Sequence, residues 1–530
     1  MGQGSMLVSA IDAQATCCGD RVAFENSKGE RITYDELKRQ SDMLARRIAC
    51  EWGVPSRVPI VIYGHKSPLM IVAFLACAKS GHAYVPIDVV YPRERVASII
   101  GQLGETVAID TTGASTDVLG SGELCRIFGT ESLEGLEGSA GEDASLAASA
   151  SDHVDLGGVG ADDTFYILFT SGSTGTPKGV EVTTSCVDGF YRWLSSTTYM
   201  SEGHRVWFNR SPFTFDVSLT DIAVGLTRGD TLFALESEAD RSLALAFEAL
   251  GASGATDWVS TPSFVEMCLA DESFNAELLP ELRRMLLAGE VLRPETVRLA
   301  QERFPGLRVF NGYGPTESTD LVTLCEITDA MLESDRALPI GYAKDGSRLV
   351  VLNPDTLEEV PNGQPGELFV IGDTVARGYW GRDDLTETAF RACPAELTCG
   401  QRSYRTGDEV IREDDGLYYY RGRLDLQIKL HGYRIELGDI ESVLCTLDEV
   451  HMACVLPVIK NDAISHLTAF VVCSGTQQQQ GFALTKHLKA KLADVIPSYM
   501  IPRSFRYIDE MPLNPSGKAD RKALRSSLSR

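Results

Sequence analysis

Long apolar runs, a secretion signal and metal-binding spacings are all missing from this sequence of 530 residues. The longest apolar run, Leu69–Ala78, is too short to cross a bilayer, and the first residues lack the basic start and apolar stretch of a signal peptide. The 13 cysteines show no C-x-x-C spacing and the eight histidines no H-x-x-x-H pair, so we expect reduced thiols and no protein-held zinc. These absences favour a cytoplasmic protein without membrane insertion.

Basic residues are also scarce. The 49 Lys and Arg residues are outnumbered by 74 Asp and Glu, which gives a net charge of −25. This excess of negative charge argues against nucleic acid or an anionic membrane as a partner. The imbalance is uneven, because residues 425–530 carry +2 whereas the first 424 residues carry −27. An acidic partner would therefore be tolerated better by the C-terminal part.

The length of the chain predicts two or more domains, because 530 residues exceed what one hydrophobic core usually supports. Apolar strand patterns at 58–63 and 83–88 flank a helix pattern at 69–80, and this alternation predicts a doubly wound α/β fold. Thr33 is the expected N-cap of an amphipathic helix that runs to about Ala49. Residues 111–163 are rich in Gly, Ala, Ser and Asp and predict a surface excursion.

A polar loop follows the apolar run Phe165–Phe169 and reads T-S-G-S-T-G-T-P-K-G-V. Its glycines let backbone N–H groups face a ligand, and its hydroxyls and Lys178 add donors and charge. The order differs from the P-loop of the common NTPases, because Pro177 precedes the lysine. We interpret the loop as a phosphate cradle; a flexible Ser/Gly turn is the alternative. The residues concerned are Thr170, Ser171, Gly172, Ser173, Thr174, Gly175 and Lys178.

Two further segments carry candidate ligand-binding residues. In S-P-F-T-F-D-V-S, Asp216 lies beside two aromatics, where a carboxylate is costly unless a cation meets it. Asp216 is thus a candidate for binding an amine, with helix N-capping as the alternative. In N-G-Y-G-P-T-E, Tyr313 offers a flat face for a purine, Thr316 a hydroxyl, and Glu317 an oxygen ligand of the kind that Mg²⁺ prefers.

Together these segments resemble the adenylate-forming superfamily, which includes amino-acid adenylation enzymes, acyl-CoA synthetases and firefly-type luciferases. The resemblance covers essentially the whole chain. It implies an α/β fold with a large core at residues 1–424, built of doubly wound sheets plus a small barrel-like subdomain, and a small mobile α+β lid at residues 425–530. It also implies an ATP- and Mg²⁺-dependent ligase that converts a carboxylate to an acyl-adenylate and then transfers the acyl group to a thiol.

The resemblance assigns roles to individual residues. Lys518, Lys178 and Thr174 take catalytic roles, Lys518 by bridging the carboxylate and the α-phosphate. Glu317 is the metal ligand, and Asp425 is the hinge of the lid. ATP binding is assigned to the phosphate loop and to Asn311, Gly312, Tyr313, Gly314, Thr316, Asp408, Arg423 and Lys518. Substrate binding is assigned to Asp216, Cys268, Gly289, Gly314 and Lys518, and a pantetheine tunnel to His431 and Gly432.

Several phrases, among them Y-G-H at 63–65 and G-H-A-Y-V-P-I-D at 81–88, look similar to the D-alanine:D-alanyl carrier protein ligases. The resemblance then implies formation of D-alanyl-AMP and transfer to an acidic phosphopantetheinylated carrier protein, which serves D-alanylation of teichoic and lipoteichoic acids. The residue matching Cys268 crowds the substrate Cα in those enzymes. Two positions depart from their pattern, Asp320 and Gly438.

Other functions stay open on the sequence. A ligase for L-alanine, serine or another small amino acid that loads a biosynthetic carrier uses the same chemistry. A CoA ligase for a small acid is opposed by Asp216. A catalytically idle nucleotide sensor is opposed by the presence of Lys178, Glu317, Asp408 and Lys518 together.

Overall fold

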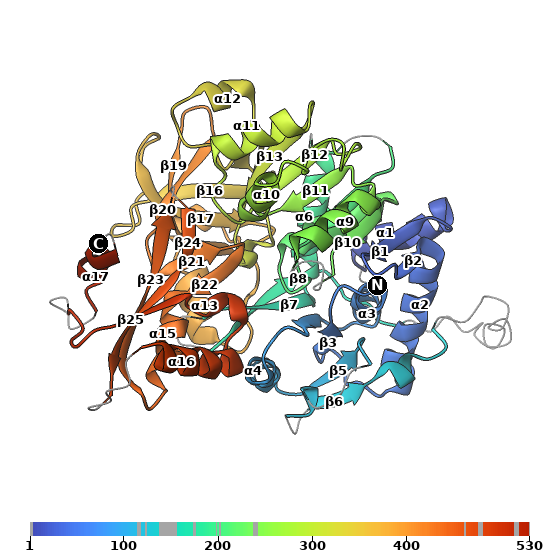
Figure 1. Cartoon of the computed structure of the whole chain (residues 1–530). Coiled ribbons are helices and arrows are strands. Elements are labelled where there is room, and N and C mark those ends of the chain that lie inside the picture. Colours follow the sequence, from blue (N-terminus) through green and yellow to red (C-terminus); the bar gives the residue numbers. More distant parts are fainter. Residues whose placement is uncertain are drawn as a thin grey trace. The chain divides into compact units, whose positions relative to one another are not determined.

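The computed structural model describes residues 4–113, 118–121, 125–136, 156–172, 176–197, 199–200, 203–236, 242–460, 463–474, 481–513 and 519–528 (Figure 1). The chain divides into two compact units. The large unit comprises Met1–Val89, Gln102–Leu168 and Gly179–Gly422. The small unit comprises Val90–Gly101, Phe169–Lys178 and Arg423–Arg530. The phosphate loop thus groups with the C-terminal hundred residues.

The first of the main sheets in the large unit has nine strands, and its central strands are parallel. Edge strands on both sides pair antiparallel. The strand order is β15 (Tyr342–Ala343), β14 (Thr323–Glu326), β13 (Arg308–Tyr313), β12 (Arg284–Ala288), β11 (Asp257–Ser260), β9 (Val206–Asn209), β10 (Thr231–Ala234), β1 (Val22–Asn26) and β2 (Arg31–Thr33).

A second sheet of seven strands is parallel through β7, β4, β3, β5 and β6. Its order is β18 (Gly378–Tyr379), β8 (Lys178–Thr183), β7 (Thr164–Thr170), β4 (Tyr84–Asp88), β3 (Ile60–Gly64), β5 (Thr106–Asp110) and β6 (Cys125–Phe128). Two mixed sheets with parallel central strands and helical connections confirm the doubly wound α/β class. About half of the expected surface excursion at 111–163 lies outside the described residues. Within the described part, Cys125–Phe128 is not an excursion but forms β6, which pairs parallel with β5 in this sheet.

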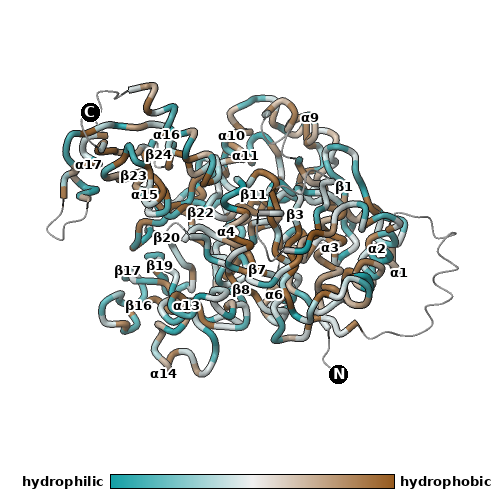
Figure 2. The backbone as a smooth tube through the Cα atoms, turned by 90° about the horizontal axis from the view of Figure 1, so that it is seen from below, coloured by the Kyte–Doolittle hydropathy of each residue, from teal (hydrophilic) through white to brown (hydrophobic). Residues whose placement is uncertain are grey.

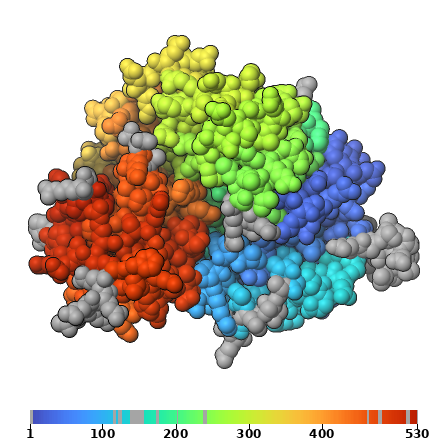
Figure 3. All heavy atoms as spheres, in the orientation of Figure 1, coloured from blue at the N-terminus to red at the C-terminus, as the bar shows by residue number. Residues whose placement is uncertain are grey.

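Helices cover both sheets, and their sequences explain where they begin and how deeply they lie. Thr33 caps α2 (Tyr34–Arg46) through a reciprocal capping box with Glu36, as predicted. α3 (Pro68–Lys79) is apolar around nearly its whole circumference, brown in Figure 2, and is buried accordingly. On the face seen in Figure 3, the green surface includes α9 (Leu243–Ser253), α10 (Pro262–Leu269) and α11 (Pro294–Arg303), whose inner sides pack on β11 and β12.

A third sheet of four strands completes the large unit and corresponds to the expected small subdomain. Its order is β16 (Ser347–Leu352), β17 (Pro365–Gly372), β19 (Ser403–Arg412) and β20 (Tyr418–Arg423). β17 pairs antiparallel with β16 and with β19. Further helices of the unit are α1 (Met6–Cys18), α6 (Thr184–Ser196), α7 (Val217–Thr220), α12 (Asp329–Glu333), α13 (Asp383–Phe390) and α14 (Ala395–Thr398).

The small unit contains a three-stranded sheet and a two-stranded hairpin. The sheet joins β23 (Val450–Lys460), β24 (Ala463–Cys473) and β25 (Ser504–Tyr507). The hairpin joins β21 (Gln427–Leu430) and β22 (Tyr433–Glu436). The helices are α15 (Leu437–Cys445), α16 (Phe482–Val495) and α17 (Arg521–Leu528); α4 (Arg93–Leu103) begins in this unit. Apolar residues of α15 and α16 form one core with the sheet.

No helix among the described residues is long and apolar enough to cross a membrane. The described cysteines are all free thiols, as the scattered spacing predicts. His82, which has no nucleophile near it in sequence, is buried and its Nδ1 lies 2.9 Å from the Val58 carbonyl oxygen. His65 contacts Asp88 at 2.7 Å.

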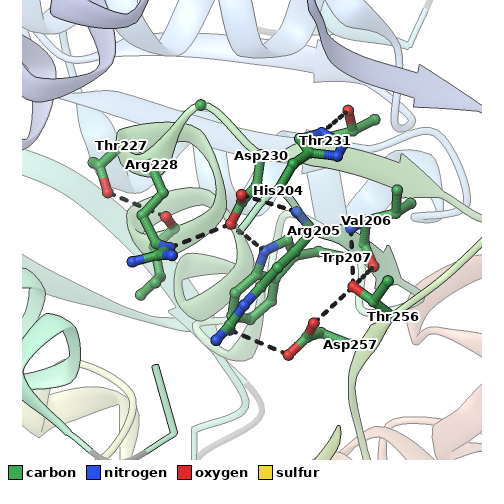
Figure 4. Close-up of polar contacts among 12 residues, drawn as sticks. His204, Arg205, Val206, Trp207, Thr227, Arg228, Asp230, Thr231, Thr256 and Asp257 are labelled. Carbon is green, nitrogen blue, oxygen red and sulfur yellow. Dashed lines mark hydrogen bonds and ion pairs between the residues drawn. The ribbon is translucent and has the colours of Figure 1, made fainter. Parts of the chain in front are cut away.

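Charged side chains gather where four parallel strands of the nine-stranded sheet begin (Figure 4). Asp257, fully buried, receives hydrogen bonds from Arg205 at 3.2 Å and Arg284 at 2.7 Å. Asp230 accepts from the Trp207 indole N–H at 3.0 Å and from the Arg205 backbone N–H at 3.1 Å. Burial lowers the pKa of Arg205, against the opposing charge of Asp257. The cluster fixes the register of β9, β10, β11 and β12.

Replacing Asp257 with asparagine is expected to destabilise the protein by about 3–5 kcal/mol, because two guanidinium groups then share a buried site without a counter-charge. Calorimetric unfolding of the whole chain measures this, with attention to the transition of the large unit. Asp355→Asn is the matched control, since Asp355 is exposed in the same unit. Equal unfolding temperatures for the two variants would contradict the role given to Asp257.

Candidate active site

Tyr313 and Asp408, far apart in the sequence, meet in the large unit. The Tyr313 hydroxyl donates to the Asp408 carboxylate at 2.6 Å, and both residues are buried. Tyr313 ends β13, and Asp408 lies on β19. Two residues before Tyr313, the side-chain amide of Asn311 donates a hydrogen bond to the Pro339 carbonyl at 2.7 Å. An aromatic ring and a carboxylate, both predicted to bind the nucleotide, are thus held together by a hydrogen bond.

Close packing requires glycine at position 314 and leaves little room at position 312. A Cβ on Gly314 would lie 1.8 Å from the backbone oxygen of Asp320, and one on Gly312 would lie 3.0 Å from the Leu321 side chain. The chain turns sharply here, since Thr319 and Asp320 both have positive φ, 61° and 66°. Asp320 is buried and accepts a hydrogen bond from the Thr220 hydroxyl. Backbone strain of this kind is frequent at functional sites.

Glu317, the expected metal ligand, is fully buried in a short turn, Thr316–Ser318, that also holds the buried Thr316. One of its carboxylate oxygens accepts a hydrogen bond from the Tyr379 hydroxyl at 2.7 Å. Among the described residues no group of three or more His, Cys, Asp and Glu side chains could hold a metal ion. A single positioned carboxylate nevertheless fits Mg²⁺, which takes its other ligands from phosphate and water.

Asp216, the candidate amine-binding residue, lies at the start of α7 and accepts a hydrogen bond from the Val217 N–H at 3.0 Å. The capping role considered from the sequence is therefore present in the structure. α7 continues directly into a π-helical turn, Asp221–Gly225. Such turns inside helices are often found at functional sites.

Cys268 and Gly289, both assigned to substrate binding, also lie in the large unit. Cys268 is fully buried on α10. Gly289 follows β12 and has φ +89°, a conformation that favours glycine. The positive φ at position 289 therefore favours glycine there, independently of any contact with substrate.

A polar network next to Asp216 was not anticipated. Asp221 is buried and accepts a hydrogen bond from Asn209 at 2.7 Å. Burial raises its pKa to about 8, against the opposing effects of the Asn209 hydrogen bond and the Lys66 charge. The Lys66 ammonium, itself buried, donates to the backbone carbonyls of Asn209 and Arg210. The network therefore joins the end of β9 to the turn after α7.

The raised pKa of Asp221 predicts a pH-dependent stability. The folded chain holds this proton from about pH 4 to pH 8 and the unfolded chain does not, so the contribution is present at low pH and is lost as the pH rises through 8. Asp221→Asn, a neutral isostere, should remove that loss. Denaturation midpoints of both proteins at pH 6 and pH 9, with Asp355→Asn as control, test this; a drop of equal size in wild type and Asp221→Asn would refute it.

In the small unit the described part of the phosphate loop contacts the segment Arg434–Asp439. The Ser171 hydroxyl donates to the Arg434 carbonyl at 2.9 Å, and the Gly172 N–H donates to the Asp439 carboxylate at 3.0 Å. Lys178 lies 3.6 Å from Glu436. A Cβ on Gly172 would lie 2.1 Å from the Thr176 carbonyl oxygen. The candidate residues Ser173, Thr174, Gly175 and Lys518 lie outside the described residues.

Arg423 and Asp425 form a two-pronged ion pair, with the Arg423 Nε donating at 2.9 Å. Asp425 also accepts the Gln427 N–H at 3.0 Å. Burial opposes ionisation of Asp425, but the hydrogen bond and charge of Arg423 outweigh it and lower the pKa. The expected hinge residue is thus tied to its own chain on both sides.

His431 and Gly432 are the two loop residues of the β21–β22 hairpin, in which Leu430 pairs with Tyr433. Both have positive φ, 53° and 84°, as a type I′ turn requires. Tyr433 stacks on Tyr499 with ring centroids 3.8 Å apart. The assignment of these two residues to a pantetheine tunnel stays a prediction.

Sequence reasoning missed several of these residues for different reasons. Tyr379 lies in an A-R-G-Y phrase at 376–379, where the hydroxyl-bearing aromatic is a usable signal. Asp221, Asn209 and Lys66 come from three distant segments, and nothing local marks them as partners. Asp439 looks like an ordinary acid in the first turn of a helix.

The large unit has an α/β fold of mixed sheets, and comparisons with known proteins identify the family of the chain. Residues 11–380 match the AMP-binding enzyme family, and residues 439–518 match the AMP-binding enzyme C-terminal domain. The chain belongs to the AMP-binding enzyme family. It is therefore a nucleotide-binding enzyme.

Similar proteins cover the full length. The chain is 39% identical over 523 residues to the D-alanine–D-alanyl carrier protein ligase of Bacillus licheniformis, spanning 98% of this chain and 99% of that one. It is 38% identical to the ligase of the same name from Bacillus cereus, and the match covers 98% of this chain and 99% of that one. The fold is shared with the Vibrio cholerae adenylation domain AlmE in complex with glycyl-adenosine-5'-phosphate (TM-score 0.79, 21% identity, 100% and 98% covered).

Proposed function

We propose that the protein activates D-alanine with ATP, forms D-alanyl-AMP, and transfers the D-alanyl group to the phosphopantetheine thiol of a carrier protein. The similarity to D-alanine–D-alanyl carrier protein ligases over 98% of the chain carries the proposal. The site supports it, because Asp216 offers a countercharge for an ammonium group and the buried Cys268 favours a small side chain. We assign the protein to the cytoplasmic steps of teichoic acid D-alanylation.

The residues divide the first half-reaction among themselves. Asp408 accepts hydrogen bonds from the ribose hydroxyls. Tyr313, whose hydroxyl is bonded to Asp408, stacks on the adenine. Lys178 and the loop amides hold the outer phosphates until pyrophosphate leaves. Lys518 joins the carboxylate of the amino acid to the α-phosphate, where negative charge develops in the transition state. No protein nucleophile is needed, since positioning and positive charge supply the catalysis.

Glu317 is the residue that would hold Mg²⁺, with Tyr379 fixing the orientation of its carboxylate. Bound there, the ion would neutralise part of the triphosphate charge. In the second half-reaction the lid turns about Asp425, and the hairpin turn at His431 and Gly432 lines the path of the pantetheine arm. The near-neutral lid suits an acidic carrier protein.

Amino-acid-dependent ATP–pyrophosphate exchange with D-alanine, L-alanine, glycine, D-serine and L-serine tests the substrate. We expect the highest kcat/KM for D-alanine, and a higher value for any other amino acid would overturn the assignment. The two serines are included because of Asp320, which is buried and accepts a hydrogen bond from Thr220. A carboxylate at this position is a hydrogen-bond acceptor, which serine could use and alanine could not. A comparison of holo-carrier protein with free CoA as acyl acceptor separates carrier loading from a CoA ligase.

A further inference from the structure

The donors that should hold phosphate already have anionic partners within the small unit. The Gly172 N–H donates to the Asp439 carboxylate at 3.0 Å, and the Lys178 ammonium lies 3.6 Å from the Glu436 carboxylate. The Ser171 hydroxyl donates to a backbone carbonyl of the same segment, at Arg434. An amide N–H, a hydroxyl and an ammonium group thus face two carboxylates and a carbonyl in the way that they would face phosphate oxygens.

The two carboxylates are built into this position and are not loose surface acids. Asp439 is 2% exposed and Glu436 8% exposed. Asp439 lies in the first turn of α15, where the helix dipole stabilises a negative charge. Glu436 ends β22 and its carboxylate also accepts from the Gln427 side chain at 2.9 Å, on the opposite strand of the hairpin. The hairpin and the helix therefore hold both acids at a fixed spacing.

The same donors cannot serve phosphate and these acids at once. A backbone N–H has a single proton, and at 3.0 Å that proton is directed at Asp439. A phosphate oxygen brought to Gly172 or Lys178 would also lie close to a like charge in a poorly hydrated place, where repulsion is strong. Binding of phosphate to the loop therefore requires the Glu436–Asp439 segment to leave.

We propose that Glu436 and Asp439 are internal phosphate mimics. They compete with the triphosphate of ATP and with pyrophosphate for the donors of the phosphate loop. Once pyrophosphate has left, they bind Gly172 and Lys178 in its place. The proposal deepens the proposed function, on which it rests for the role of the loop as phosphate cradle. Its consequence is an ordered cycle, since release of pyrophosphate permits the contact and bound pyrophosphate prevents it.

Calorimetric titration of the full chain with pyrophosphate alone tests the competition. In Asp439→Asn and Glu436→Gln the mimic loses its charge and keeps its shape, so pyrophosphate should bind 5- to 30-fold more tightly than to wild type, the factor that follows from relief of one or two kcal/mol. Asp494→Asn, an exposed acid on α16 of the same unit, is the matched control and should bind as wild type does. Unchanged or weaker binding in both mimic variants would overturn the proposal.

A second measurement separates competition from a merely structural role. Starting from preformed aminoacyl-AMP, thiol transfer by wild type should be inhibited by added pyrophosphate, and both variants should transfer several-fold more slowly, because the loop is no longer captured. Their rate of adenylate formation should not fall. Loss of both half-reactions together, or a lowered unfolding temperature with weaker pyrophosphate binding, would show structural damage instead. The pyrophosphate titration contains no amino acid, so a wrong substrate assignment would leave its result intact.

Discussion

Replacing Lys518 with alanine is expected to lower adenylate formation by about 10²–10³-fold, because a positive charge is removed from the place where charge builds up on the α-phosphate. The loss should appear in kcat for ATP–pyrophosphate exchange more than in the KM for ATP, since the lysine acts mainly in the transition state. Transfer of the acyl group from chemically prepared aminoacyl-AMP to the carrier should stay within a few-fold of wild type, because in the proposed cycle the lid moves that residue away before transfer.

The neighbouring Lys522 supplies the control. It lies exposed on α17, four residues from Lys518, and its replacement with alanine changes the overall charge in the same way. Lys522→Ala should therefore leave both half-reactions unaltered. If Lys518→Ala exchanged pyrophosphate at the wild-type rate, the assignment of this lysine to the first half-reaction would fail.

Local chemistry accounts for the parts of the fold that the sequence predicted well. Thr33 and Glu36 form the capping box at the start of α2, a contact between residues three apart that any local pattern contains. The strands at 58–63 and 83–88 lie side by side and parallel as β3 and β4. Short-range patterning of apolar residues was enough for both, because each element buries the side that its sequence makes apolar.

Long-range pairings explain what local patterns could not give. Tyr313 and Asp408 were each predicted to bind part of the nucleotide. Nothing in either segment indicates that the Tyr313 hydroxyl donates a hydrogen bond to the Asp408 carboxylate, 95 residues away. Nothing near Asp257 in the sequence marks it as the buried partner of two arginines. Contacts of this kind depend on the order of strands in the sheet, which topology decides and composition does not.

Functional motifs were more informative than their neighbours for a physical reason. Gly314 must be glycine because the Asp320 carbonyl lies where a Cβ would be, and His431 and Gly432 must turn within two residues. Such demands leave a readable trace in the sequence. Asp439 and Glu436 leave none, because an acid near the start of a helix has an adequate local explanation and its contact with Gly172 lies 267 residues away.

Replacing Asp216 with asparagine is expected to lower kcat/KM for D-alanine by about 10²–10³-fold, since an unpaired buried ammonium group typically costs 2–5 kcal/mol. Asparagine caps helices about as well as aspartate, so α7 should keep its start at Val217 and the variant should fold normally. The substitution thereby removes the countercharge and spares the capping role that the structure shows.

Propionate, which is D-alanine without its amino group, is the substrate that decides whether Asp216 binds the amine. Exchange with propionate should be weak in wild type and should not decrease in Asp216→Asn, so the preference for D-alanine over propionate collapses. Asp216→Ala removes cap and charge together and should lose stability of about 1 kcal/mol besides. An equal loss with both substrates in Asp216→Asn would mean that this carboxylate shapes the site through α7 alone and that the ammonium group is held elsewhere.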